Sequence, residues 1–184
     1  MAEEVADNGL SAHMTNKRLD EFDTMLKRFV GRFEESGVLC EYDGDLVRRQ
    51  DTDCSALDAV YAKLPGKFPP LYERLVLTYR WYRSEVNEFF DIFGNPPGAG
   101  LDGLSDELYA DKNLWEACIP NGYLQFGSGP SFYDPLCFDL SRKTNRNDYA
   151  IVQLDHEQIL CNSRIKVVQI LAPSFESLVL SVIA

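Results

Sequence analysis

The chain has 184 residues, and its 29 acidic against 18 basic side chains give a net charge of −11 at pH 7. This length is typical of one domain, and the acidic balance disfavours nucleic-acid binding, since phosphate contacts require clustered lysine and arginine. No apolar run is long enough for a transmembrane helix, and residues 1–14 lack the apolar core of a signal peptide. We therefore expect a cytoplasmic protein that does not bind membranes, with a disordered acidic segment at 1–14 and a single domain over 15–184.

The N-terminal half is predicted to be mainly helical. Thr15 is expected to cap a long amphipathic helix that ends before Gly37, because apolar side chains recur at spacings of three and four. A short strand is expected at 38–42. A second helix follows Asp53, and a third opens at Pro70, since proline is favoured in the first turn of a helix. The apolar positions of the first helix are Leu19, Phe22, Leu26, Phe29, Val30 and Phe33.

The C-terminal half is predicted to be mainly strands. We expect a strand over 84–94, a loop over 95–103 and a helix over 104–118. Ser174 is expected to cap a closing helix, which Phe175 anchors to the sheet. Because helices precede strands, without alternating strand and helix, the pattern indicates an α+β domain. Four further strands are expected at 122–127, 135–141, 149–155 and 165–171.

Few segments resemble a catalytic motif. Residues 98–103 spell GxGxxG, but Pro96 and Pro97 precede them and the region is acidic, so a flexible loop is favoured over a dinucleotide site. The five cysteines include no CxxC pair, which disfavours a zinc cluster and is consistent with buried thiols in a reducing compartment. No nucleophile elbow or P-loop is present. We therefore expect neither a metal nor a cofactor.

The triplet Asp155-His156-Glu157 is the best candidate for acid–base or metal chemistry, because histidine titrates near neutral pH. Against this, Leu160 stands where HExxH requires its second histidine, and the chain's other histidine, His13, lies in the acidic N-terminal segment. The alternative is that Asp155 and His156 close a turn by hydrogen bonding. We favour this structural role and expect no enzymatic activity.

Two features indicate a protein partner. Trp81 and Tyr82 belong to a dense aromatic cluster, which forms either core or, for one of them, a surface anchor. Residues 84–141 hold ten acids against Lys112 alone, which accounts for −9 of the total charge. These acids either form a solvated surface without a function or create a negative field that speeds the binding of a basic partner. The predicted partner-binding residues are Trp81, Tyr82, Glu85, Glu88, Asp102, Asp106 and Glu107.

Several segments together resemble the SUKH superfamily, which includes a yeast cell-wall-assembly regulator and many bacterial proteins. The segments are LPGKFPPLYERLVLTYRW (64–81), GYLQFGSG (122–129), YDPLCFDLS (133–141), YAIVQLDHE (149–157) and APSFESLV (172–179). The resemblance spans about Leu64 to Val182. The matching positions, which the resemblance indicates to be architectural, are Gly127, Asp134, Phe138, Asp139, Asp155, His156, Glu157, Ser174 and Phe175.

The resemblance implies an α+β domain with a central, mostly antiparallel sheet flanked by helices, and no catalytic activity. Many bacterial members are immunity proteins that neutralise toxins, often nucleases, whereas others are signalling scaffolds. Our leading hypothesis is therefore an immunity protein for a basic toxin domain. The alternatives are a regulatory scaffold without a toxin partner and a small enzyme or metal protein that uses His156.

Overall fold

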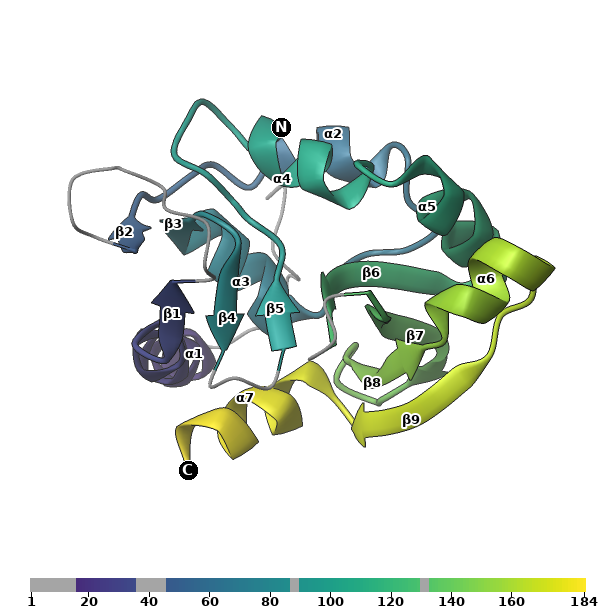
Figure 1. Ribbon diagram of the computed structural model, residues 1–184. Helices are drawn as coiled ribbons and strands as arrows, with labels where there is room; N and C mark the ends of the chain where they lie inside the picture. The colour runs from purple at the N-terminus through teal and green to yellow at the C-terminus, as the bar shows by residue number, and fades with distance from the viewer. Residues whose placement is uncertain (1–15, 36–45, 87–89, 130–132) are drawn as a thin grey trace, which may run out of the picture.

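The structure is a computed structural model that describes residues 16–35, 46–86, 90–129 and 133–184. It is an α+β domain whose described strands form a seven-stranded antiparallel sheet in the order β1-β4-β5-β6-β7-β8-β9, beside a two-stranded sheet of β2 and β3 (Figure 1). The strands of the larger sheet are β1 (Phe33–Glu35), β4 (Ser84–Val86), β5 (Phe90–Ile92), β6 (Tyr123–Ser128), β7 (Pro135–Lys143), β8 (Tyr149–Leu154) and β9 (Val167–Ala172). The smaller sheet pairs β2 (Val47–Arg49) with β3 (Tyr79–Trp81).

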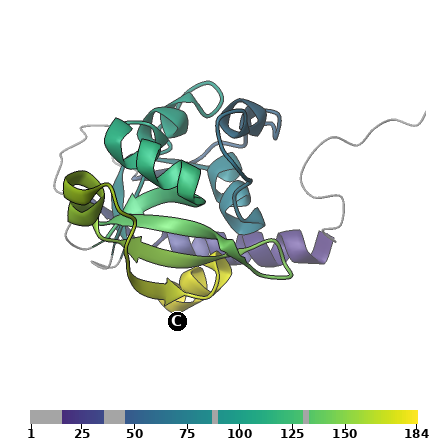
Figure 2. The same ribbon diagram turned by 90° about the vertical axis from the view of Figure 1, so that its right-hand side faces the viewer.

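The helices surround this sheet. They are α1 (Asn16–Val30), α2 (Ala56–Tyr61), α3 (Pro70–Thr78), α4 (Asp102–Leu108), α5 (Lys112–Cys118), α6 (His156–Asn162) and α7 (Phe175–Ile183). Side chains alternate across β7 and β8, so Phe138 and Ile151 enter the main core, whereas Cys137 and Val152 enter a smaller core with α5 and α6. Figure 2 shows the sheet on edge, with α7 (yellow) below the green strands and the teal helices above. None of the described helices is long and apolar enough to cross a membrane.

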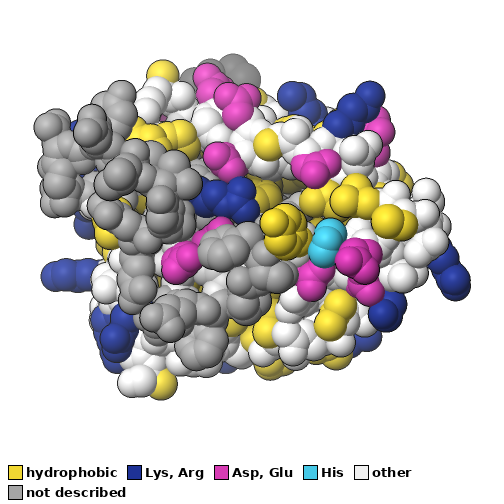
Figure 3. Space-filling view, viewed as in Figure 1, with side chains coloured by type: hydrophobic (Ala, Val, Ile, Leu, Met, Phe, Trp, Pro, Cys, Tyr) yellow, Lys and Arg dark blue, Asp and Glu magenta, His cyan; other side chains and the backbone are white. Residues whose placement is uncertain are grey.

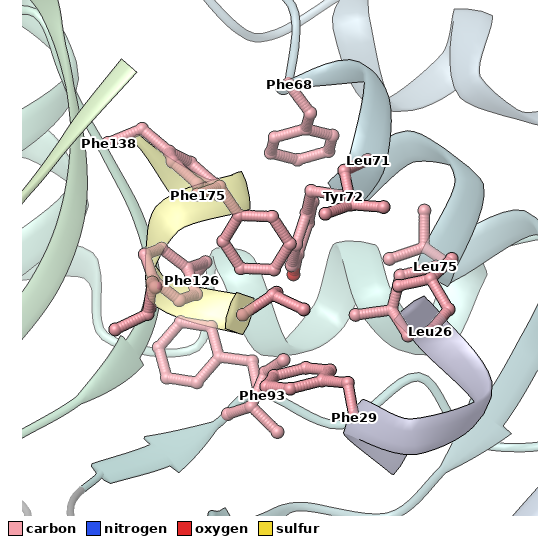
Figure 4. Close-up of a cluster of buried hydrophobic side chains, with 14 of the residues drawn as sticks. Leu26, Phe29, Phe68, Leu71, Tyr72, Leu75, Phe93, Phe126, Phe138 and Phe175 are labelled. Atoms are coloured by element: carbon pink, nitrogen blue, oxygen red, sulfur yellow. The ribbon is translucent and has the colours of Figure 1, made fainter. Parts of the chain in front are cut away.

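Aromatic rings fill the centre of the main core (Figure 4). Phe126 and Phe138 stack with ring centroids 4.3 Å apart, and Phe175 meets both edge-on. Tyr72 of α3 and Phe29 of α1 approach Phe175 at 5.4 and 6.2 Å. The predicted anchoring of α7 through Phe175 is therefore confirmed, because these rings join α1, α3 and α7 to the sheet.

The first turn of α7 is held by two side chains. The Ser174 hydroxyl accepts a hydrogen bond from the Ser177 amide at 3.0 Å, which confirms the predicted cap. The other acceptor is Asp148, which the sequence analysis missed. Its carboxylate accepts from the amides of Phe175 at 2.9 Å and Glu176 at 3.0 Å, as well as from Tyr149 at 2.7 Å. The turn between β7 and β8 is thereby joined to the start of α7.

Several predicted elements need correction. The single strand over 84–94 is two strands, β4 and β5, which pair with each other. The helix over 104–118 is divided into α4 and α5, because the Asp111 side chain accepts from the amides of Asn113 and Leu114 and starts a new helix. Phe33, assigned to the first helix, begins β1. The predicted strand at 38–42 and the predicted disorder of 1–14 lie outside the described residues.

Candidate functional site

A cleft of about 190 Å³ opens beside the start of α6. Charged, polar and aromatic side chains line it from several helices and strands or their flanks, and Figure 3 shows acidic, basic and hydrophobic side chains around the histidine on this face. Arg83 precedes β4, Glu107 belongs to α4, Ser128 ends β6, and Tyr133 and His156 lie on either side of β7 and β8 in sequence. This cleft is the candidate functional site.

His156 is held in the cleft by Asp134. The Asp134 Oδ1 lies 2.7 Å from the His156 Nδ1 and accepts from the His156 backbone amide at 3.2 Å. The other oxygen, Oδ2, accepts from the Gln153 Nε2 at 2.9 Å. Burial alone would raise the pKa of Asp134, but the hydrogen bonds from His156 and Gln153 outweigh it and hold that pKa below its usual range. Asp134 therefore orients the imidazole. A carboxylate on one ring nitrogen also orients the histidines that act in acid–base catalysis.

Asp155 and Glu157, the neighbours of His156, lie apart from this contact. The Asp155 carboxylate caps α6 by accepting from the Gln158 amide at 3.0 Å, and Lys166 lies 3.0 Å away. Glu157 is exposed in the first turn of the helix. The predicted turn at Asp155 and His156 is thus the start of a helix, α6, which the sequence analysis missed. Among the described residues, no three histidine, cysteine or acidic side chains could together hold a metal ion.

Arg83 is the basic side chain of the cleft. Its Nε lies 3.3 Å from the buried Asp91 carboxylate, and its Nη2 donates to the Ser128 hydroxyl at 3.0 Å. Burial raises the pKa of Glu107 on the opposite wall, and the charge of Arg83 opposes that shift. Arg83 was not predicted as a site residue because it stands in the sequence just before the acidic region, which begins at Ser84.

Tyr133 forms the exposed aromatic wall of the cleft. Its side chain stacks on His156 with ring centroids 5.4 Å apart and an interplanar angle of 29°, yet 68 % of the residue is exposed. Leu160 on α6 also lines the cleft and is 49 % exposed. An exposed aromatic ring that is already held in place by a neighbouring side chain is typical of an interface anchor, because little side-chain entropy is lost on binding.

The structure disperses the ten acids predicted to form one field. Asp91 and Asp139 are 2 % exposed and paired with Arg83 and Arg142, so they are internal. Asp134 is occupied by His156 and Gln153, Asp111 starts α5, and Glu116 lies 3.6 Å from Lys112. Asp102 and Asp106 are exposed on α4, and Glu85 and Glu107 are half-buried, whereas Glu88 lies outside the described residues.

Trp81 cannot be the predicted surface anchor. It is fully buried in β3, and its indole Nε1 donates to the Phe93 carbonyl at 2.9 Å. Tyr82 is half-buried. The sequence pattern of a tryptophan between a helix and a strand is compatible with either a buried or an exposed side chain. The packing of β1 over Trp81 decides that it is buried, since the Phe33 ring lies 5.6 Å from its ring. Tyr133 is the exposed aromatic side chain that the cleft contains instead.

The remaining positions of the SUKH resemblance have structural contacts. A Cβ at Gly127 would lie 2.1 Å from the Asp91 backbone oxygen, so only glycine allows β5 and β6 to pair there. Phe138 and Phe175 are fully buried. The Asp139 carboxylate accepts from the amide and the hydroxyl of Ser141 at 3.0 and 2.6 Å.

The GxGxxG segment makes contacts of its own. Gly100 has a left-handed φ of +64°, and its carbonyl accepts from the buried Arg80 guanidinium at 3.1 Å. The Gly98 carbonyl accepts from Gln50 at 2.8 Å. A Cβ at Gly103 would overlap the Pro96 ring. These contacts tie the loop to the small sheet.

A comparison of the chain with protein-family models, curated proteins and solved structures found no match.

Proposed function

We propose that this chain is a protein-binding domain whose partner is basic, and that the partner docks on the cleft and on α4. The supporting observation is the combination of the exposed Tyr133 ring, fixed on His156, with the acids Asp102, Asp106 and Glu107 along one helix beside it. Aromatic anchors carry much of the affinity of protein interfaces, and complementary charge speeds association. The net charge of −11 adds a long-range attraction for a basic partner.

On the SUKH resemblance, we propose that the partner is a toxin domain and that the chain neutralises it in the cytoplasm. A regulatory scaffold is the alternative within the same mode of binding. A toxin gene beside this gene favours immunity, and its absence together with capture of a non-toxic basic partner favours the scaffold. Co-expression with the captured partner tests the same point, because an immunity protein restores growth that the partner alone abolishes.

The interface is tested with a charge-neutralised variant and a matched control. The variant Asp102→Asn, Asp106→Asn, Glu107→Gln removes the three acids of α4, of which Glu107 lines the cleft. The control, which removes three exposed acids from α1 and α2, is Asp20→Asn, Glu21→Gln, Asp58→Asn. Both variants change the net charge equally, so a difference between them reports the location of the interface rather than the overall field.

A pull-down with the unaltered protein first identifies the partner, and stopped-flow association at low and high salt then compares the variants. We expect the cleft variant to associate several-fold more slowly than the control at low salt, with the difference reduced at high salt because exposed charges are screened over about 8 Å at physiological ionic strength. Tyr133→Ala is expected to speed dissociation instead. An acidic partner, or equal association rates for the two variants, contradicts this docking surface.

A second candidate function is general acid–base catalysis, favoured specifically by the 2.7 Å contact between Asp134 and the His156 imidazole at the cleft wall. It is separated from binding by His156→Gln. If the partner is still bound and neutralised by this variant, His156 serves to position Tyr133. If binding persists while the biological effect is lost, the imidazole acts chemically on the partner.

A further inference from the structure

A second and larger cavity, of about 560 Å³, lies on another part of the molecule. Its walls come from α2, the 65–70 segment that leads into α3, and the hairpin of β7 and β8. Its volume is within the range of small-molecule sites. It shares no residue with the cleft at His156. The cavity therefore requires its own explanation.

The cavity contains a buried carboxylate without a basic partner at ion-pair distance. Glu73 of α3 is 8 % exposed, and its Oε1 accepts from the Tyr61 hydroxyl at 2.5 Å. The Tyr61 hydroxyl in turn accepts from the Phe68 amide at 3.2 Å. Among the described residues, no lysine, arginine or histidine lies within 4.0 Å of the Glu73 carboxylate. Burial raises the pKa of Glu73, and the hydrogen bond from Tyr61 and the charge of Lys67 oppose that shift without cancelling it. A buried carboxylate is costly unless a cation or several donors compensate it.

The walls around Glu73 suit an ammonium group and an apolar body. Tyr61, Phe68 and Tyr149 contribute aromatic rings, and Leu57 and Leu140 contribute aliphatic surface. Aromatic faces attract cations through their quadrupole, and a carboxylate among them adds a direct ion pair. A primary ammonium group at Glu73 would therefore add an ion pair to the hydrogen bond that Tyr61 already donates.

The cavity also presents two cations. Lys67 lies with its Nζ 5.8 Å from the centre of the Tyr61 ring, and Lys143 lies 5.9 Å from that of Tyr149. Both lysines are exposed, and Asp58 is the other charged residue of the lining. Two exposed ammonium groups oppose a ligand that carries only positive charge, but they favour one that also carries a carboxylate. The lining thus favours a compact ligand that carries both a positive and a negative charge.

We propose that this cavity binds a free amino acid with a large apolar side chain. Its ammonium group pairs with Glu73, its carboxylate lies between Lys67 and Lys143, and its side chain packs against Leu57, Phe68 and Leu140. The cavity is distinct from the proposed protein interface, so this proposal does not depend on the proposed function.

Titration calorimetry of the full chain with L-phenylalanine, L-tyrosine, L-tryptophan, L-leucine and L-methionine tests the proposal. We expect at least one to bind at millimolar concentration or below. Phenethylamine lacks the carboxylate and 3-phenylpropanoate lacks the ammonium group, and each is expected to bind more weakly than L-phenylalanine. Absence of binding for all five amino acids overturns the proposal, and so does an amine that binds as tightly as its parent amino acid.

Variants locate the site. Glu73→Gln keeps an acceptor for the Tyr61 hydroxyl but removes the charge, and it is expected to weaken binding about ten- to hundredfold, the equivalent of one charged hydrogen bond. Lys67→Ala with Lys143→Ala leaves the buried groups intact and is expected to weaken binding as well, which keeps the test valid if Glu73→Gln fails to fold. The matched control is Lys17→Ala with Lys27→Ala on α1. Binding that survives both the Glu73 and the double-lysine changes places the ligand elsewhere and overturns the assignment.

Discussion

Asp148 is expected to be one of the most sensitive positions of the fold, although it lies in a turn. It is 5 % exposed, and its two carboxylate oxygens accept from three amides. Two of those donors, at Tyr149 and Phe175, are buried, whereas that of Glu176 is partly accessible. Asp148→Ala leaves the two buried amides without an acceptor, at a cost of about 1–3 kcal/mol each. The expected loss in the free energy of unfolding is therefore about 2–6 kcal/mol.

Asp148→Asn separates the charge from the geometry. The amide oxygen of asparagine can replace Oδ1, which accepts from the amides of Tyr149 and Phe175. The variant therefore loses only the hydrogen bond from the Glu176 amide to Oδ2. Because that donor can be hydrated, the expected cost is about 0.5–2 kcal/mol, the value of a helix cap. Burial raises the pKa of Asp148, which means that the buried charge is itself unfavourable. Removal of the charge therefore offsets part of the expected loss of stability.

Urea unfolding followed by circular dichroism measures both changes, with Asp102→Asn as an exposed control that is expected to stay within about 0.5 kcal/mol of the unaltered protein. A loss below about 1 kcal/mol for Asp148→Ala would refute the reasoning, because water would then have replaced the buried acceptor.

Three further predictions use the same assay. Phe175→Ala, which empties the centre of the aromatic core, is expected to cost about 3–5 kcal/mol, and a loss below about 1 kcal/mol would mean that α7 is not docked there. Gly127→Ala forces a Cβ against the β5 backbone and is expected to cost about 1–3 kcal/mol, whereas Gly98→Ala, with open space around its Cβ, is expected to be nearly neutral; equal effects would contradict the close approach. The hydrogen bond from Arg74 holds the pKa of Asp23 below its usual range, so the pair stabilises the fold above about pH 4 and this contribution is lost as the pH falls through the folded-state pKa. Asp23→Asn is expected to cost about 0.2–1 kcal/mol at neutral pH and to reduce the loss of stability in acid, and an unchanged acid limb would rule out this linkage.

The local pattern of the sequence is sufficient to predict α1, α3 and α7, the strands around β6, β7 and β8, and the α+β class. Apolar residues at helical spacing show which face of a helix is buried, and Ser174 shows where α7 begins. These signals are local, because each depends on residues within about two turns of one another. The division of α4 from α5 was readable from the same chemistry, since Asp111 is a favoured capping residue.

The tertiary structure alone decides which side chains meet across the chain. Asp134 reaches His156 across 22 positions, and Asp148 reaches Phe175 across 27. Periodicity gives the buried face of an element but not the element that covers it, and for that reason Trp81, which the sequence allows on the surface, is buried beneath β1. The same limit applies to Glu73, whose place in a cavity depends on three separate segments of the chain folding around it.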